Sequence, residues 1–474
     1  MKILKKLVSA KVFLFLQLIA SIVLTITIVR VKILPTKYLA VIVGILFIFL
    51  LLTFLLQFRA RETSIRAMFS RILASFLCIA LIMGSILVNN SFGYIENVAN
   101  ANYETNMMSV IVLKDSGYKS IDDLSGKTIG VNKNVDEENL TKAMADIDGK
   151  IDASYTPIDD FEALGDSLYK KKTDAILVNN AYCTMIENKY ENFTSETNII
   201  YHVALKTKTE DFANEGAVKD GIFNVCITGI DTEGPVSTVS RSDVNMIMTV
   251  NMKKHKILLT SIPRDYYVTL ASKGAKDKLT HSGIYGVNET VKTLENLLDI
   301  DLDYYIRINF TSLIKIVDVL GGVDVTSDRD LYAQGIHISK GVNHMDGEMA
   351  LAYSRERHSY AEGDRHRIQN QQDVIMAIIK KASSPAILTN YQAFMQKLSG
   401  TFETNMSSDD ISSVINMQLD NMKGFTMENQ YLNGKGTKMT GLYSMPHSNL
   451  YTMIPDQSTV DSASKAIKEL EKEE

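Results

Sequence analysis

The stretch RSDVNMIMTVNMKKHKILLTSIPRD, residues 241–265, contains two apolar runs separated by a short polar connection. The runs end near residues 250 and 262, and the basic connection at 251–256 is too short for anything but a turn. This pattern predicts a β-hairpin. Folding it about Lys253 and Lys254 places Asp243 opposite Arg264 at one end of a sheet. Taken alone, such a pair is a cross-strand ion pair at a sheet rim, worth no more than about 1 kcal/mol.

A second charged group follows a hundred residues later, in the segment 351–357. We expect this segment to be a strand, with Leu351, Tyr353, Arg355 and Arg357 on one face because strand side chains alternate. Two guanidinium groups side by side repel each other unless an anion lies between them. The alternative interpretation is a charged face in solvent.

A helix is predicted from about Arg365 to Lys381, after a turn at Gly363-Asp364. Arg367 and Gln371 lie on or beside its apolar stripe in the first turns, so they point towards the protein near a positive helix N-terminus. A helix N-terminus favours phosphate, and arginine forks match phosphate oxygens well.

Together these segments predict a phosphate site formed by Arg264, Arg355, Arg357 and Arg367. The strand that starts at residue 222 runs into Asp231, which with Asp243 would supply carboxylates for Mg²⁺. Charge neutralisation and positioning are what displacement at phosphorus requires.

The first 90 residues hold three apolar runs, at 12–29, 38–58 and 72–88. Each is close to the roughly 20 residues that span a bilayer, so we expect a membrane anchor over 12–88. A cleaved signal peptide is the alternative for the first run, but two further spans follow it. Four basic residues precede the first run and four lie between the second and third runs, eight in all, against three in the loop between the first and second runs. The bias places residues 1–11 in the cytoplasm and everything after about Asn89 outside.

The outer part divides by composition. We expect linkers at 89–105 and 205–220, an accessory α/β domain at 106–204 and the main domain at 221–474. The accessory domain weakly resembles one lobe of an extracellular solute-binding protein, although a spacer or docking domain without a ligand is favoured. A turn is expected at 434–437, and a charged helix at 462–474.

Composition excludes several classes. The net charge of −5 gives no basic excess for nucleic-acid binding, and the cytoplasmic parts are too small to supply one. The three cysteines form neither a CxxC pair nor a disulfide framework.

Seven short blocks resemble the signature of the LytR-CpsA-Psr family. In order, they are 240–243, 261–265, 277–281, 309–310, 320–325, 347–351 and 355–372, within the range 223–382. The three-span anchor and the accessory domain are similar to the architecture of streptococcal capsule-locus members of that family.

The resemblance implies an α/β/α sandwich with a hydrophobic tunnel for a polyprenyl chain. It implies an Mg²⁺-dependent phosphotransferase that attaches a glycopolymer, capsular or related, from polyprenyl pyrophosphate to a muramic acid hydroxyl of peptidoglycan. Carried over by position, the metal ligands are Asp231 and Asp243, and the pyrophosphate ligands are Arg264, Arg355, Arg357, Arg367 and Gln371. Arg241 and Asp364 support the site. Arg365-His366 departs from the aromatic–glycine pair of many members, which puts the shape of the local turn in doubt.

The expected partners are the polyprenyl-linked glycan, peptidoglycan, the cytoplasmic membrane and membrane proteins of capsule synthesis. Apolar residues that could line the tunnel, or simply form core, are Val291, Leu294, Leu297, Leu298, Ile314, Val317 and Leu320. Asp243 is a candidate general base. Two other functions stay open: a sensor that binds the lipid-linked glycan without turnover, and a pyrophosphatase that uses water as acceptor.

Overall fold

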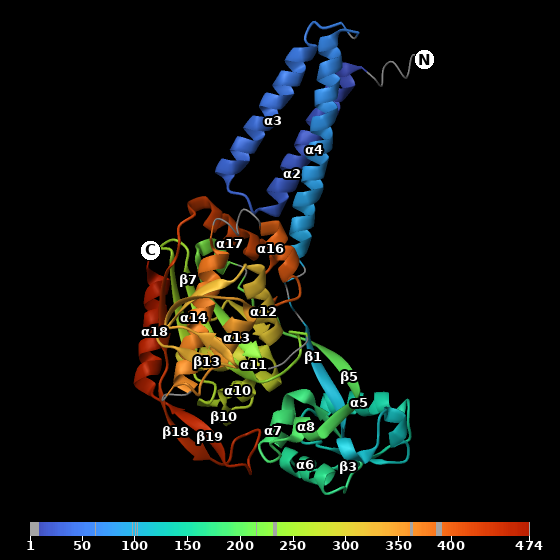
Figure 1. Ribbon diagram of the computed structural model, residues 1–474, viewed down its shortest axis with the longest axis vertical. Coiled ribbons are helices and arrows are strands. Elements are labelled where there is room, and N and C mark those ends of the chain that lie inside the picture. The colour runs from blue at the N-terminus through green and yellow to red at the C-terminus, as the bar shows by residue number, and fades with distance from the viewer. Residues whose placement is uncertain are drawn as a thin grey trace.

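The computed structural model describes residues 9–473 apart from positions 62, 97, 100, 102, 215, 231–234, 361–363 and 385–390. Three parts follow one another along the long axis: a bundle of long helices, a large α/β unit and a small sheet unit (Figure 1). The chain passes from the bundle to the small unit first and then returns to build the large unit between them.

The bundle consists of α2 (Ala10–Val31), α3 (Thr36–Gln57) and α4 (Ile65–Glu96). All three are long and apolar enough to cross a membrane, which confirms the predicted anchor. A hydrogen bond of 2.9 Å from Thr53 gives the buried Gln17 side chain a partner inside the bundle. The short α2–α3 connection lies against the large unit, where Lys32 pairs with Asp409 at 2.5 Å.

The small unit is built on a sheet of order β3-β2-β4-β1-β5. Its strands are β1 (Tyr103–Leu113), β2 (Thr128–Val131), β3 (Ser154–Pro157), β4 (Ala175–Asn179) and β5 (Thr197–Lys208). Helices α5 (Glu137–Asp148) and α6 (Phe161–Tyr169) pack into separate apolar clusters on the sheet. The α/β pattern expected from the sequence is therefore present.

The large unit contains a six-stranded sheet of order β16-β11-β6-β7-β8-β17. Its strands are β6 (Ile222–Ile230), β7 (Ser242–Asn251), β8 (Lys256–Ile262), β11 (Tyr304–Asn309), β16 (Glu403–Thr404) and β17 (Thr426–Tyr431). β7 and β8 form the predicted hairpin, with Asn251 opposite Lys256 and Asn245 opposite Ile262. This register centres the turn on Lys253 and Lys254, as predicted.

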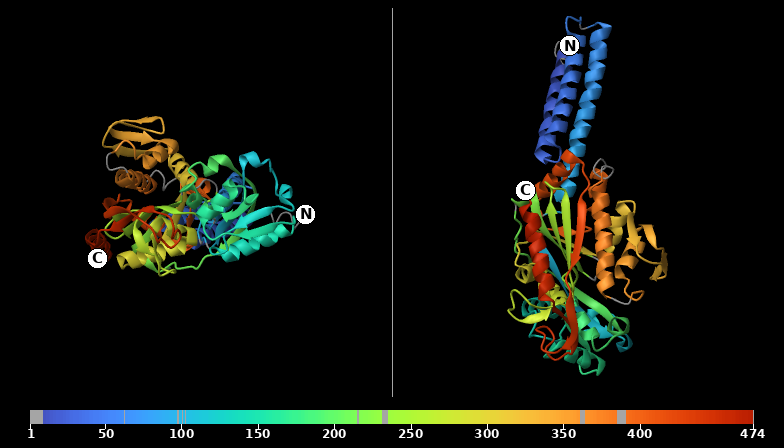
Figure 2. Two further views of the ribbon diagram at one scale, coloured as in Figure 1. Left: turned by 90° about the horizontal axis from the view of Figure 1, so that it is seen from below. Right: turned by 90° about the vertical axis from the view of Figure 1, so that its left-hand side faces the viewer.

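Helices cover both faces of this sheet (Figure 2). The helices α11 (Val287–Leu298) and α18 (Gln457–Lys472) share one buried cluster with the sheet. On the other face, α14 (Asp364–Ala382) and α17 (Ser408–Asn421) pack against residues of β6, β7 and β8. The result is the expected α/β/α sandwich, and the predicted helix after Gly363-Asp364 is confirmed.

The segment 351–357 is not a strand, so that prediction is wrong. Helix α13 (Gly347–Arg355) occupies most of it, and the chain leaves the helix before Arg357. The side chain of Asp346 caps the helix by accepting a hydrogen bond from the Met349 amide at 2.9 Å. Helix α13 packs against α12 (Phe310–Val319) and four short strands, β12 (Val323–Ser327), β13 (Leu331–Ala333), β14 (Ile336–Ile338) and β15 (Gly341–Met345).

Three further segments differ from the sequence prediction. The expected linker 89–105 contains the last turns of α4 and the start of β1, and the expected linker 205–220 contains the end of β5 and the helix α9 (Ala217–Asp220). The expected turn at 434–437 belongs to strand β18 (Gly434–Met439), which pairs with β19 (Leu450–Pro455). The charged C-terminal helix is confirmed as α18.

A buried arginine connects the small unit to the large sheet. Arg307 on β11 pairs with Glu104 at the start of β1 and, at 2.7 Å, with Glu403 on β16. Its side chain is only 3% exposed, so both ion pairs lie out of water. Burial alone would lower the pKa of Arg307, but the two carboxylates outweigh burial and raise it.

Replacing Arg307 with alanine should leave two carboxylates buried without their cation. We expect the Arg307→Ala protein to lose about 3–5 kcal/mol of unfolding free energy. Denaturant unfolding of the purified full-length protein in detergent measures this, with the exposed Lys292→Ala as control. An unfolding midpoint equal to that of the control would show that the ion pairs contribute no net stability.

Candidate active site

A cavity of about 550 Å³ opens where the β7–β8 sheet end, the C-terminal end of α13 and the first turns of α14 meet. Five arginines line it, from four separate segments: Arg241, Arg264, Arg355, Arg357 and Arg367. Asp243 and Gln371 also line it. The structure therefore brings together every predicted phosphate-binding side chain that it describes.

Asp243 lies at the base of the cavity, and its side chain is 12% exposed. Its Oδ1 atom is 3.1 Å from Arg264 and accepts a hydrogen bond of 2.7 Å from Thr280. The hairpin thus creates the predicted acid–base pair. Burial alone would raise the pKa of Asp243, but Arg241 and Arg264 outweigh burial and hold it below the ordinary value.

Arg355 and Arg357 form the exposed rim of the cavity. The guanidinium of Arg355 lies 4.3 Å from the centre of the Phe310 ring, a cation–π distance that holds it over the opening. The two arginines reach the cavity from a helix end and the following loop, and not from one face of a strand. Their shared position is as predicted, although the predicted local structure is not.

Arg367 and Gln371 face the cavity from the first turns of α14, as predicted. The two residues next to Gln371 form hydrogen bonds to other elements of the large unit. Asn370 donates to the Tyr353 carbonyl at 3.1 Å, and Gln372 donates to the Gln430 carbonyl at 2.8 Å. These bonds fasten α14 to α13 and β17, and so fix the angle at which Arg367 enters the site.

Two predicted site residues cannot be placed. Asp231 and the side chain of Asp364 lie outside the described residues. At the departure from the family pattern, the His366 ring stacks on Tyr360, with centroids 3.5 Å apart. The turn just before it, at 361–363, also lies outside the described residues.

One wall of the cavity is apolar. Its side chains are Ile308, Phe310, Leu313, Leu351, Val374 and Ile375. None of the seven residues suggested for a tunnel lines the cavity; Val291, Leu294, Leu298, Val317 and Leu320 are buried in the cores that flank it. For those five, the alternative of plain core packing is correct.

Among the described residues, no three histidine, cysteine, aspartate or glutamate side chains gather as a metal site. Asp243 still fits a cation, because its buried Oδ2 atom accepts no hydrogen bond from the described residues and lies 3.6 Å from Arg241. Mg²⁺ commonly takes one or two carboxylates and completes its shell with water and phosphate oxygens. One carboxylate among the described residues, beside the predicted phosphate site, is compatible with this kind of Mg²⁺ coordination.

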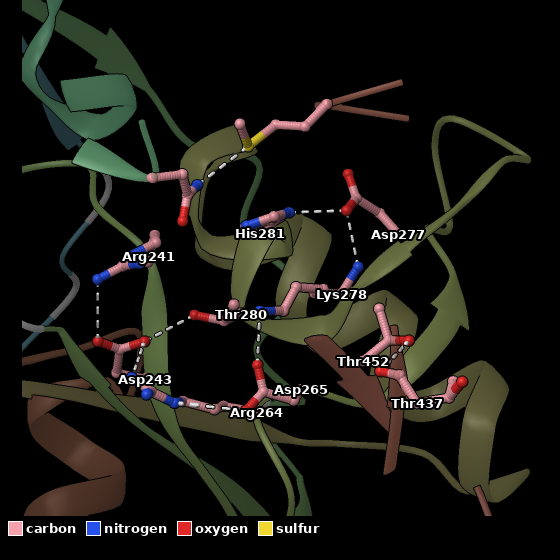
Figure 3. Close-up of polar contacts among 12 residues, drawn as sticks. Arg241, Asp243, Arg264, Asp265, Asp277, Lys278, Thr280, His281, Thr437 and Thr452 are labelled. Atoms are coloured by element: carbon pink, nitrogen blue, oxygen red, sulfur yellow. Dashed lines mark hydrogen bonds and ion pairs between the residues drawn. The ribbon is translucent and has the colours of Figure 1, made fainter. Parts of the chain in front are cut away.

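Helix α10 (Leu279–Ser282) supports the cavity from behind (Figure 3). Its Thr280 holds Asp243, while the preceding Lys278 pairs with Asp265 at 2.7 Å, next to Arg264. Thr280 and Phe310 lie within the family blocks 277–281 and 309–310, but the sequence alone indicates no role for them. Each contacts a charged site residue from a distant segment of the chain, and sequence spacing alone does not predict such a contact.

His281 of α10 belongs to a buried cluster with Asp277, just before the helix, and Ser444, from the loop between β18 and β19. The Asp277 carboxylate and the Ser444 hydroxyl both contact the same His281 atom, Nδ1, at 2.7 and 2.8 Å. A catalytic triad needs the serine and the acid on opposite ring nitrogens. This cluster instead fastens the loop that carries Ser444 to the main domain.

The model of the LytR-CpsA-Psr family matches residues 187–464, more than half of the chain. The chain belongs to the LytR-CpsA-Psr family. A model described as DNA polymerase processivity factor also matches residues 66–178, but that range is under half of the chain and begins inside the apolar helix α4, so it shows no second family.

Several similar proteins are named as teichoic acid transferases. A polyisoprenyl-teichoic acid–peptidoglycan teichoic acid transferase, TagU, of Bacillus cereus is 30% identical over 286 residues, which cover 60% of this chain and 91% of that protein. TagU of Bacillus subtilis is 33% identical over 250 residues, covering 52% and 77%. The crystal structure of B. subtilis TagV matches with a TM-score of 0.46 and 27% identity over 52% of this chain and 96% of that one.

The buried cluster behind the site makes stability depend on pH. Burial alone would raise the pKa of Asp277, but His281 and Ser444 outweigh burial and hold it below its ordinary value. A depressed folded-state pKa stabilises the fold above the unfolded pKa, near 4, and this stabilisation is lost as the pH falls through the folded value. We therefore expect the unfolding free energy to fall more steeply between pH 5 and pH 2 in the wild type than in Asp277→Asn. Parallel curves in urea titrations would contradict this.

Proposed function

We propose that this protein transfers a glycopolymer, capsular or related, from a polyprenyl pyrophosphate carrier to a hydroxyl of peptidoglycan. The observation that carries the proposal is the cavity itself, in which five arginines face an apolar wall. A polyprenyl pyrophosphate has the matching form, with a doubly charged head and a hydrocarbon chain.

The arginines would bind the pyrophosphate and stabilise the charge that develops on it. Arg241, Arg264 and Arg367 are partly buried, so they act where water is scarce and electrostatic stabilisation is stronger. Arg355 and Arg357 at the rim would close over the phosphate oxygens. Planar guanidinium forks can bind such oxygens in pairs, which also fixes the orientation of the phosphorus.

In the reaction, the acceptor hydroxyl oxygen forms a bond to the phosphorus that carries the glycan. The bond from that phosphorus to the bridging oxygen breaks, and its electron pair leaves with polyprenyl phosphate. The acceptor proton passes to a base. The depressed pKa of Asp243 makes its carboxylate a weak proton acceptor. Asp243 is therefore better suited to bind a cation than to act as the general base.

We further propose that Asp243, with Asp231, holds Mg²⁺ against the pyrophosphate. The cation would neutralise phosphate charge during the displacement. Support comes from the Oδ2 atom of Asp243, which is buried and accepts no hydrogen bond from described residues.

The arrangement of the helices in the bundle bears on the membrane topology. We propose that residues 1–11 are cytoplasmic and that the two α/β units lie outside the cytoplasmic membrane. The helices α2 and α3 meet at the end of the bundle that contacts α17, and the N-terminal end of α2 lies at the opposite end (Figure 1). The cavity-bearing unit lies at the opposite end of the bundle from the N-terminal end of α2, which supports a location where both peptidoglycan and the lipid carrier would be within reach.

The double variant Arg355→Ala/Arg357→Ala tests the phosphate site. Each lost charge-assisted hydrogen bond costs about 1.5–3 kcal/mol, so transfer should fall by roughly a hundred-fold or more. Polyprenyl phosphates that co-purify from native membranes, detected by mass spectrometry, should disappear as well.

The matched control is Arg365→Ala, because Arg365 stands two residues before Arg367 on the same helix but contacts Tyr431 outside the cavity. It should retain both lipid and activity. Normal wall attachment by the double variant would show that the arginines do not bind the substrate.

The metal assignment is tested with Asp243→Asn, which removes the charge and keeps the shape. We expect transfer to be lost and Mn²⁺, used as a paramagnetic probe in place of Mg²⁺, to bind at least about ten-fold more weakly in electron paramagnetic resonance titrations. Full transfer by the wild type in the presence of EDTA would contradict a role for the cation.

A further inference from the structure

A second cavity, of about 570 Å³, lies between the small sheet unit and the large unit. The small unit contributes Asn132, Asp136 and Tyr182, and the large unit contributes Tyr285 and Tyr443. The two units share apolar contacts there, since Val239, Ile284 and Met445 pack into the core cluster of β1, α6 and β4. The cavity is thus formed by fixed surfaces on both sides.

Its charge is opposite to that of the arginine cavity. The lining carries five carboxylates and one lysine, and the lysine, Lys273, lies 4.7 Å from the centre of the Tyr285 ring. A phosphate or a polyanionic polymer would be repelled here. Amides from Asn106, Asn132, Asn134 and Asn139 complete the polar part of the wall.

Tyr182 carries a hydrogen-bonding group without a partner. Its side chain is only 3% exposed, and its ring stacks on Phe161 with centroids 4.7 Å apart. The hydroxyl makes no hydrogen bond with any described residue, and it is not among the fully buried polar atoms that lack a partner, so it is accessible from the cavity that Tyr182 lines. Burial raises the pKa of Tyr182, and the cavity residues Asp136, Tyr285 and Tyr443 raise it further, so the hydroxyl stays protonated and surrounded by other cavity groups.

Asp136 also lines this cavity, and its backbone is in the left-handed conformation. It has a φ of 59°, in the left-handed region that, glycine apart, mainly asparagine, aspartate and histidine adopt. It stands at the start of α5 but does not cap the helix. Its two oxygens accept from Asn139 at 2.7 Å and from Asn179 at 2.8 Å. A carboxylate has about four acceptor positions, so each oxygen keeps one for a hydroxyl donor.

Aromatic rings, carboxylates, amides and an unpartnered hydroxyl, without excess positive charge, match one class of ligand. Sugar hydroxyls donate to carboxylates and amide oxygens, and the C–H faces of a pyranose pack on exposed aromatic rings. The rings of Tyr285 and Tyr443, with centroids 6.1 Å apart and Tyr443 47% exposed, provide such a surface at the mouth.

We propose that this second cavity binds a neutral oligosaccharide, as a glycan subsite separate from the pyrophosphate site. The proposal extends the proposed function, because both substrates of that reaction are glycans. Helix α10 contacts residues of both cavities: Thr280 bonds to Asp243 in the first (Figure 3), and the adjacent His281 bonds to Ser444, which lines the second. A glycan seated in the second cavity would therefore be held on the same rigid element that positions Asp243.

The test measures sugar binding by the full-length protein in lipid nanodiscs, since alkyl-glycoside detergents carry sugar headgroups. The probes are chitotetraose, the neutral oligomer of N-acetylglucosamine, and the phosphate-free glycan released from the native lipid-linked donor. Binding of the first indicates the acceptor strand as the source, and binding of the second indicates the donor. A glycerol-phosphate oligomer should not bind at this cavity. Isothermal titration showing that neither neutral probe binds would overturn the proposal.

Two variants locate the binding. Tyr182→Phe removes one hydroxyl and keeps the stacked ring, and Tyr443→Ala removes the exposed face; each should weaken binding roughly ten-fold. Tyr332→Ala is the control, because Tyr332 is 68% exposed and lines neither cavity. Unchanged affinity in both cavity variants would also overturn the proposal.

The two proposals can fail separately. Arg355→Ala/Arg357→Ala should abolish transfer and leave neutral-sugar binding unchanged, whereas Tyr182→Phe should raise the KM for the glycan substrate and leave lipid retention intact. Sugar binding that depends on Tyr182, in a wild-type protein that transfers nothing, would contradict the proposed function while supporting the glycan site.

Discussion

The placement of Arg307 between Glu104 and Glu403 is the constraint on which the arrangement of the units depends. Burying three charges is costly, and only their mutual pairing makes it tolerable. Glu104 begins the strand that enters the small unit, and it also accepts a hydrogen bond of 2.9 Å from the Val287 amide at the start of α11. One carboxylate therefore fixes β1 against both β11 and α11, and the wall of the second cavity is positioned by the same contact.

The two cavities differ in the charge of their linings. One cavity concentrates arginines beside an apolar wall, and the other concentrates carboxylates and amides beside aromatic rings. The short helix α10 and the residues just before it contact both. Its rigidity comes from buried bonds, those of Thr280 to Asp243 and of His281 to Asp277 and Ser444, and not from helix length. A phosphate-binding site and a site for uncharged sugar can thus be close without competing for the same ligand.

The sequence predicts the structure correctly where the local residue pattern also determines the long-range contacts. The polar connection at 251–256 and the apolar runs beside it determine a register, and the register alone places Asp243 beside Arg264. The strand prediction for 351–357 is wrong because a short run of apolar and charged residues fits a strand or a helix equally well. The residue that indicates a helix is the capping residue Asp346, upstream of the run. Gly434 was read as part of a turn, but it lies in a strand where a Cβ atom would stand 2.5 Å from the Ile454 carbonyl oxygen. The second cavity had no local signal, because its walls come from segments as distant as Tyr182 and Tyr443.

The length of α4 has a consequence for how the enzyme meets its lipid. Its 32 residues extend about 48 Å at 1.5 Å per residue, which is more than a bilayer core, so the helix continues beyond the bilayer core as a stiff rod. Inserting one residue there would turn the outer units by about 100° around the membrane normal and raise them by about 1.5 Å, against the resistance of the Lys32–Asp409 and Lys37–Asp420 pairs. The cavity thus has a set height and a set azimuth above the bilayer. A lipid carrier that diffuses in the plane of the membrane can therefore approach the cavity from one side of the protein only.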